Sequence, residues 1–87
     1  MSKTRTAFLL MAQYERPTVP LDQVADDFLG LSKRVANERA NAGELPFPVF
    51  RLGNSQKNPY MVHVDDLADF IEKQRADAHR QWERSQV

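Results

Sequence analysis

The sequence predicts one small α+β domain, and three observations lead to this prediction. Apolar residues recur at helical spacing between residues 21 and 29. Residues 33–42 follow directly and lie between a helix-start and a helix-stop signal. Two short β-prone segments come next, with a polar turn between them, and a further amphipathic segment ends the chain. Two helices, a β-hairpin and a final helix make up a winged helix-turn-helix, in which the hairpin is the wing.

Length and composition limit the possible functions. With 87 residues, the chain is expected to form a single domain, residues 1–87, with a modest core and no deep active site. We place the core at residues 19–71 and a C-terminal helical extension at residues 72–87. The absence of cysteine excludes disulfides and thiolate metal sites, and the apolar run at residues 7–12 is too short for a signal peptide or a membrane span. We therefore expect a cytoplasmic protein.

The N-terminal segment, residues 4–14, is apolar without clear alternation. Its leucine, methionine, alanine and glutamine content favours a helix, which Thr4 or Thr6 would cap. Core packing is the expected role of Phe8, Leu9, Leu10 and Met11, and a dimer seam is the alternative. Pro17 and Pro20 then bracket a β-prone pair, so residues 15–20 form either a linker or a short strand.

The first helix of the helix-turn-helix is predicted at residues 21–29, with Gly30 as its stop. Only one residue separates Gly30 from the next helix start, and so short a connection makes two helices cross steeply. An ordinary helical hairpin would produce the same pattern. The expected inward positions are Leu21, Val24, Ala25, Phe28 and Leu29.

The second helix, residues 33–42, has the clearest boundary signals. Ser32 is a good N-cap, and Gly43 can take the left-handed conformation that ends a helix. Ala36 and Ala40 lie one turn apart and would pack closely against a neighbour. Lysine and arginine are suited to guanine and asparagine to adenine, which indicates a recognition helix for the major groove of DNA. The side chains that would serve this role are Lys33, Arg34, Asn37, Glu38 and Asn41.

The wing is predicted from two strands, residues 49–52 and 60–64, joined by a turn at residues 53–59. Wings commonly place polar tips on the phosphate backbone or in the minor groove. The alternative is a tip that is simply solvated, as most hairpin tips are. The candidate contacts are Arg51, Asn54, Ser55, Gln56 and Lys57.

Asp65 is expected to cap a final helix that has Asp66 and Asp69 in its first turn, where the helix dipole favours negative charge. Trp82 lies near its end and would fold back onto the core, meet a second subunit or remain exposed. The expected inner face consists of Leu67, Phe70, Ile71, Gln74 and Ala78.

Charge is separated along the chain although the formal net charge is +0. Residues 31–60 hold five basic and two acidic residues, whereas residues 61–78 hold two basic and five acidic ones. A basic centre between acidic flanks is typical of a protein that contacts an anionic partner with one face. His63 and His79 lack the spacing of a zinc pair, and no glycine-rich phosphate loop occurs, so we expect neither an enzyme nor a metal or cofactor site.

Two resemblances support this interpretation. Residues 19–70 resemble the winged helix-turn-helix of phage excisionases and MerR-type regulators. More specifically, the chain is similar to the pyocin activator protein family, PrtN, which implies a bacterial or prophage DNA-binding transcriptional activator acting at promoter-proximal boxes. The segments that carry this second resemblance are residues 8–14 (FLLMAQY), 19–21 (VPL), 45–46 (LP), 51–52 (RL), 55–57 (SQK), 62–64 (VHV) and 66–71 (DLADFI).

We therefore predict a sequence-specific DNA-binding transcriptional regulator, an activator of pyocin or prophage-like genes. Its expected partners are double-stranded DNA, RNA polymerase and a second copy of the chain, as a homodimer or a cooperative oligomer on DNA, and not a membrane. The alternatives are an excisionase-like architectural factor and a protein-interaction module that uses residues 8–14 or Trp82. The predicted DNA contacts are Ser32, Lys33, Arg34, Asn37, Glu38, Asn41, Arg51, Asn54, Ser55, Gln56 and Lys57.

Overall fold

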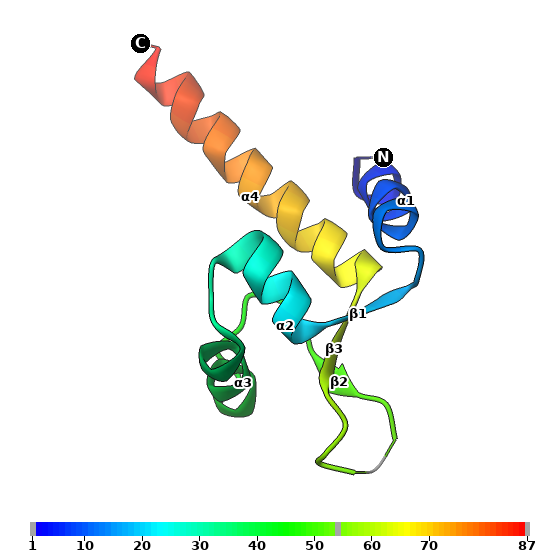
Figure 1. Cartoon of the computed structure of the whole chain (residues 1–87). Helices are drawn as coiled ribbons and strands as arrows, with labels where there is room; N and C mark the ends of the chain where they lie inside the picture. Colours follow the sequence, from blue (N-terminus) through cyan, green and yellow to red (C-terminus); the bar gives the residue numbers. More distant parts are fainter. Residues whose placement is uncertain (1, 54, 87) are drawn as a thin grey trace.

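The computed structural model describes residues 2–53 and 55–86 and confirms the α+β prediction. The chain forms a small three-stranded sheet. Figure 1 shows helices around this sheet and a long C-terminal helix that runs out of the body. The elements are, in order, α1 (Ser2–Tyr14), β1 (Thr18–Pro20), α2 (Leu21–Val24), the π-helical turn η1 (Ala25–Leu29), α3 (Lys33–Ala42), β2 (Phe50–Arg51), β3 (Tyr60–His63) and α4 (Val64–Ser85).

The sheet has the strand order β1-β3-β2 and is antiparallel throughout. The predicted hairpin is confirmed as β2 and β3, with Phe50 opposite Met61 and Arg51 opposite Tyr60. Both strands are shorter than predicted, because β2 covers only two residues and β3 passes directly into α4 after His63. The segment at residues 15–20 contains a strand, β1, which adds a third member to the sheet by pairing Val19 with Val62.

The core lies where the sheet meets α1, α2 and α4. Its largest fully buried side chains are Leu21, Leu67, Val19, Val24, Val62 and Val64. Of the four α1 residues predicted to pack in the core, only Leu10 does, together with Ala7. Phe8, Leu9 and Met11 are 63%, 60% and 42% exposed, because they lie on the faces of α1 that no other described element covers. The chain between α3 and β2 is anchored by Phe47, whose ring meets that of Phe70 edge-on with 5.4 Å between centroids.

The helix before the turn is confirmed, but its inward face differs from the prediction at Phe28. Leu21, Val24 and Ala25 are buried as expected, whereas Phe28 is 37% exposed. The helix changes to π-helical geometry from Ala25 onward. π-helical hydrogen bonds span five residues instead of four, so each turn holds more residues than an α-helical turn. The residue after Ala25 that returns to the inner face is therefore no longer Phe28.

Both predicted caps of the outer helices are wrong. α1 begins at Ser2, so Thr4 and Thr6 lie inside the helix, where the Thr6 hydroxyl donates to Glu72 Oε2 at 2.6 Å. The cap of α4 is His63, whose Nδ1 accepts the backbone N–H of Asp65 at 3.0 Å. Since β3 runs into α4 without a loop, the helix starts two residues before the position that sequence signals indicate.

α4 leaves the body after Glu72. The predicted inner face is confirmed at Leu67, which is fully buried, and at Phe70 and Ile71, which are half-buried. Gln74 and Ala78 are exposed, contrary to the prediction, because no other part of the described chain covers the helix there. All described residues from Lys73 onward are exposed, including Trp82 at 57%.

The start of α3 offers a direct test of local stability. Ser32 is confirmed as the N-cap, since its Oγ accepts the Val35 N–H at 3.2 Å. Ser32→Ala is expected to lower the free energy of unfolding by about 1 kcal/mol, because that N–H loses its partner. Thermal unfolding followed by circular dichroism measures the loss. Ser32→Thr keeps the capping oxygen, and an equal loss in both variants would contradict the capping role.

Candidate nucleic-acid interface

α3 is held against α2 by small side chains and exposes a polar face. Its predicted bounds are confirmed, and it ends at Gly43 with a left-handed φ of 69°. Ala36 is fully buried and Ala40 half-buried, so the helix approaches its neighbour closely on that side. Lys33, Arg34 and Asn41 are exposed, and Asn37 is half-buried.

A hollow of about 270 Å³ lies between α3 and the wing. Lys33 and Asn37 line it from α3, one turn apart on the helix. Two residues of α2, Leu21 and Asp22, also border it, and Asp22 is its one acidic group among the described residues. The lining residues of the wing are Arg51, Gln56, Lys57, Asn58, Pro59 and Tyr60. The structure therefore brings basic and amide groups from both predicted DNA-contact segments to one place.

Arg51 is held in position by the opposite strand. Its Nε donates to the Asn58 carbonyl oxygen at 3.0 Å. Its guanidinium lies over the Tyr60 ring, with Cζ 3.8 Å from the ring centroid. Because one nitrogen is used and the group is stacked, only the terminal nitrogens of Arg51 are available to an external anion.

Asn41 and Arg34 also have partners within the chain. The Tyr60 hydroxyl donates to Asn41 Oδ1 at 2.6 Å and so ties α3 to β3. Arg34 Nε lies 3.4 Å from Glu38 Oε1, in an i,i+4 pair whose side chains are both strongly exposed. Such a pair contributes little to stability, so Arg34 can exchange Glu38 for another acceptor at low cost. Arg34 does not line the hollow, but it lies one residue after Lys33 on the same helix.

The wing tip contains a tight turn. The Ser55 carbonyl accepts the Asn58 N–H at 3.1 Å, and the Ser55 hydroxyl accepts the Lys57 N–H at 3.1 Å. Gln56 and Lys57 are exposed. Asn54, which was predicted as a contact, lies outside the described residues. The Ser32 hydroxyl, a further predicted contact, already accepts the capping hydrogen bond from Val35 N–H and can still donate its own proton.

Sequence reasoning missed Asn58 and Tyr60. Asn58 supports the wing twice, because its carbonyl accepts from Arg51 and its side-chain amide donates to the Leu52 carbonyl. Tyr60 contacts both Arg51 and Asn41. The hairpin register, which pairs Arg51 with Tyr60, is the signal that would have identified the stacking. The hydrogen bond between Tyr60 and Asn41 could not have been predicted from nearby residues, because the two lie 19 residues apart in the chain.

Gly53 shapes the wing and can be tested. Its φ is 89°, and an added Cβ would lie 2.8 Å from Asn58 Nδ2. Gly53→Ala is expected to cost about 1–2 kcal/mol in backbone conformation and additionally to disturb the hydrogen bond from Asn58 to Leu52. Gly43→Ala is the matched control, because Gly43 also has a positive φ but no atom within 4 Å of the added Cβ. Chemical denaturation compares the two, and an equal loss would contradict the steric role of Gly53.

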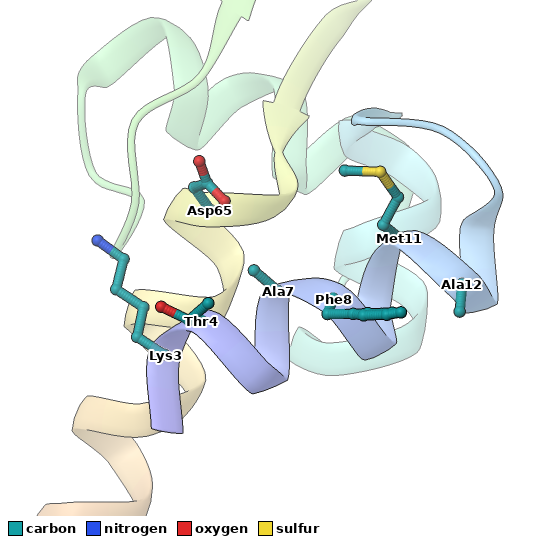
Figure 2. A pocket seen from close by; sticks show the side chains of 7 residues that line it. All are labelled: Lys3, Thr4, Ala7, Phe8, Met11, Ala12 and Asp65. Carbon is teal, nitrogen blue, oxygen red and sulfur yellow. The ribbon is translucent and has the colours of Figure 1, made fainter. Parts of the chain in front are cut away.

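A second surface lies on α1, away from the wing. A groove of about 770 Å³ is lined by Lys3, Thr4, Ala7, Phe8, Met11 and Ala12 of α1 and by Asp65 of α4. Figure 2 shows Lys3 and Asp65 toward one end and Phe8 and Met11 toward the other. Phe8 and Met11 are exposed, so this surface is apolar and open.

Within residues 2–53 and 55–86, no group of three or more histidine, aspartate or glutamate side chains is placed to hold a metal ion. No helix in the same part of the chain is both long and apolar enough to cross a membrane.

The packed pair of α2 with η1 and α3, followed by the β2-β3 wing and α4, defines the class as a small winged helix-turn-helix-like domain. The chain belongs to the family of pyocin activator protein PrtN, whose profile matches residues 6–78. This confirms the family that the sequence resembled. No curated protein and no solved structure matches the chain. The family is one of regulatory activators of pyocin genes and not of enzymes.

Proposed function

We propose that the protein activates pyocin or prophage-like genes by binding specific DNA sequences through α3 and the wing. The observation that carries this proposal is the shared hollow, in which Lys33 and Asn37 of α3 meet Gln56 and Lys57 of the wing. A helix and a neighbouring wing that present donors together are the arrangement by which winged domains contact adjacent parts of a duplex.

In this proposal α3 would contact base edges and the wing would contact phosphates. Arg34, Asn37 and Lys33, in the first turns of α3, would face base edges in the major groove, where bidentate donors distinguish guanine and adenine. Lys57 and Gln56 would contact the adjacent phosphates, together with the terminal nitrogens of Arg51. Asn41 could use both its oxygen and its amide nitrogen on one adenine only by giving up its hydrogen bond from Tyr60, so we expect it to act mainly by orienting α3.

A binding selection tests the proposal. Purified protein is incubated with genomic fragments over a range of salt concentrations, and the retained fragments are sequenced. We expect a common motif upstream of pyocin or phage-like genes, and an affinity that falls with salt as the protein releases counterions from a few phosphates. Retention without a common motif, or no retention at low salt, would overturn the proposal.

Footprinting on the selected fragments separates activation from its alternatives. An activator protects promoter-proximal boxes and raises transcript levels from them, which also requires a contact with RNA polymerase. An excisionase-like factor protects attachment sites instead. A protein-interaction module protects neither, and its activity survives substitution of Arg34 and Lys57.

A further inference from the structure

One face of α4 is covered along its first half and bare along its second. α1 packs on the first half, where Ala7 and Leu10 share the core with Ala68 and the Thr6 hydroxyl bonds to Glu72. Figure 1 shows α1 beside the N-terminal half of α4 and the C-terminal half running free. Helical geometry continues the covered face of Ala68 and Glu72 into Ala76, His79 and Glu83, and all three are exposed.

The bare face holds a large aromatic side chain beside a hollow, among charged side chains that pair along the helix. Arg75 Nη1 lies 3.7 Å from Glu72 Oε1 and His79 Nε2 lies 3.9 Å from Glu83 Oε2. Because Arg75, His79 and Glu83 are exposed, these pairs can exchange partners at low cost. We call this face the α4 stripe and define it as Glu72, Arg75, Ala76, His79, Trp82 and Glu83, which lie within one side of the helix. A hollow of about 650 Å³ sits over Glu72, Arg75, Ala76, Ala78 and His79. Just beyond it projects Trp82, whose ring stacks on His79 at 5.7 Å between centroids. The stripe thus holds a hollow and a large aromatic side chain within two turns.

We propose that the α4 stripe binds the same stripe of a second copy of this chain, with the two helices antiparallel and the two-fold axis at His79. In this arrangement Trp82 of each copy enters the hollow over Ala76 of the other. A two-fold interface requires a self-complementary surface. The α4 stripe is self-complementary because it holds both a projecting side chain, Trp82, and a hollow that could receive it.

The register follows from three separate features. The free part of α4, residues 73–85, has its midpoint at residue 79, so an antiparallel pair centred there ends where each helix meets the other body. The same centre places Trp82 opposite Ala76 of the second copy. It also places Arg75 beside Trp82 and near Glu83 of that copy, which gives a cation–π contact and an ion pair on each side of the axis.

The charges of the stripe favour the antiparallel over the parallel arrangement. In a parallel pair Arg75 would face Arg75 and Glu83 would face Glu83, so like charges would meet at both ends. In the antiparallel pair Arg75 meets Glu83 twice. The inference does not depend on DNA binding, although a dimer would carry two recognition helices and so could engage two half-sites.

Sedimentation equilibrium of the full chain tests the dimer. We expect the wild type to show a concentration-dependent monomer–dimer equilibrium. Trp82→Ala is expected to raise the dissociation constant by about 30-fold or more, since aromatic anchors in pockets dominate such interfaces. Gln81→Ala is the matched control, because Gln81 lies on the opposite side of the same exposed helix. Trp82 is the one tryptophan of the chain, so its fluorescence emission should shift to shorter wavelength as concentration rises.

Charge reversal tests the register. Arg75→Glu and Glu83→Arg should each weaken the dimer, because each brings two like charges together across the interface. The double variant should restore it, and circular dichroism checks that the helix is kept in every variant. Failure of the double variant to recover would overturn the antiparallel register.

Two further results would overturn the inference as a whole. One is a wild-type chain that stays monomeric at about millimolar concentration, a range in which even weak specific interfaces associate. The other is a dimer that Trp82→Ala leaves intact and Phe8→Ala abolishes, which would place the second copy on the α1 groove instead. Neither result would bear on whether a single copy binds DNA, so the two proposals fail independently.

Discussion

Arg34→Ala is expected to weaken binding to the cognate DNA by about 1–3 kcal/mol, or roughly 5- to 150-fold, because a bidentate contact to a base edge is lost. The loss should be much smaller on non-cognate DNA. Arg34 is well placed for this role because it is exposed, lies in the first turn of α3 and is held only by a weak surface pair with Glu38. Fluorescence anisotropy with cognate and scrambled duplexes measures both affinities.

Lys57→Ala, which removes a proposed phosphate contact, is compared with Arg34→Ala, which removes a proposed base contact. Lys57 lies at the wing tip, so its substitution should weaken cognate and scrambled duplexes alike and reduce the slope of log affinity against log salt by about one. Arg39→Ala is the control for net charge, because Arg39 is an exposed cation on the side of α3 away from Asn37. An effect of Arg39→Ala equal to that of Arg34→Ala would contradict a specific base contact.

Leu67→Ala is expected to lower the free energy of unfolding by about 2–5 kcal/mol, the cost typical of removing a buried leucine side chain. Leu67 is 0% exposed and is among the largest fully buried side chains, at the point where α4 joins the core. A domain of this size has a total stability of about 5–15 kcal/mol, so the variant should lose a large share of it and unfold at a clearly lower denaturant concentration.

Chemical denaturation with intrinsic helix content as the signal measures this loss. Leu9→Ala removes the same atoms from a side chain that is 60% exposed, and we expect it to change stability by less than about 0.5 kcal/mol. Similar losses in the two variants would show that the core does not lie where α4 meets the sheet.

The features that the sequence predicted well depend on residues close together in the chain. Ser32 and Gly43 bound α3 as expected, because a cap acts through hydrogen bonds within one helical turn. Ala36 is buried for the same local reason, since its position on the helix follows from the helical period. The two strands of the wing were found from β-propensity and an intervening turn, although their lengths were overestimated.

The wrong predictions share a different cause. His63 caps α4 in place of Asp65 because β1 pairs with β3 as far as His63, which lies opposite Thr18. The helix then begins at the next residue, Val64. Gln74 and Ala78 follow the helical period of Leu67 correctly, yet they are exposed because no other described element reaches that far along α4. Periodicity predicts which side of a helix faces inward, but not where the covering elements end.

In the candidate site, too, the features that depend on neighbouring residues were predicted and those that depend on distant residues were not. Its basic and amide side chains could be chosen from their segments alone, but the partner of Asn41 could not. Asn41 and Tyr60 are 19 residues apart in the chain and meet only because α3 crosses beside the hairpin. That contact occupies one predicted base-reading group, and the stacking of Arg51 on Tyr60 restricts a predicted phosphate contact.

By itself, the sequence determined the family, the α+β class, the bounds of α3 and the segments rich in basic and amide side chains, because each of these depends on residue types at short spacing. Only the tertiary structure decided that Lys33 and Lys57 border one hollow and that α4 extends bare beyond Glu72. These depend on how α2 and α3 cross, on the register of the hairpin and on where α1 stops covering α4. Such relations join residues far apart in the chain, and they are set by packing of the whole core.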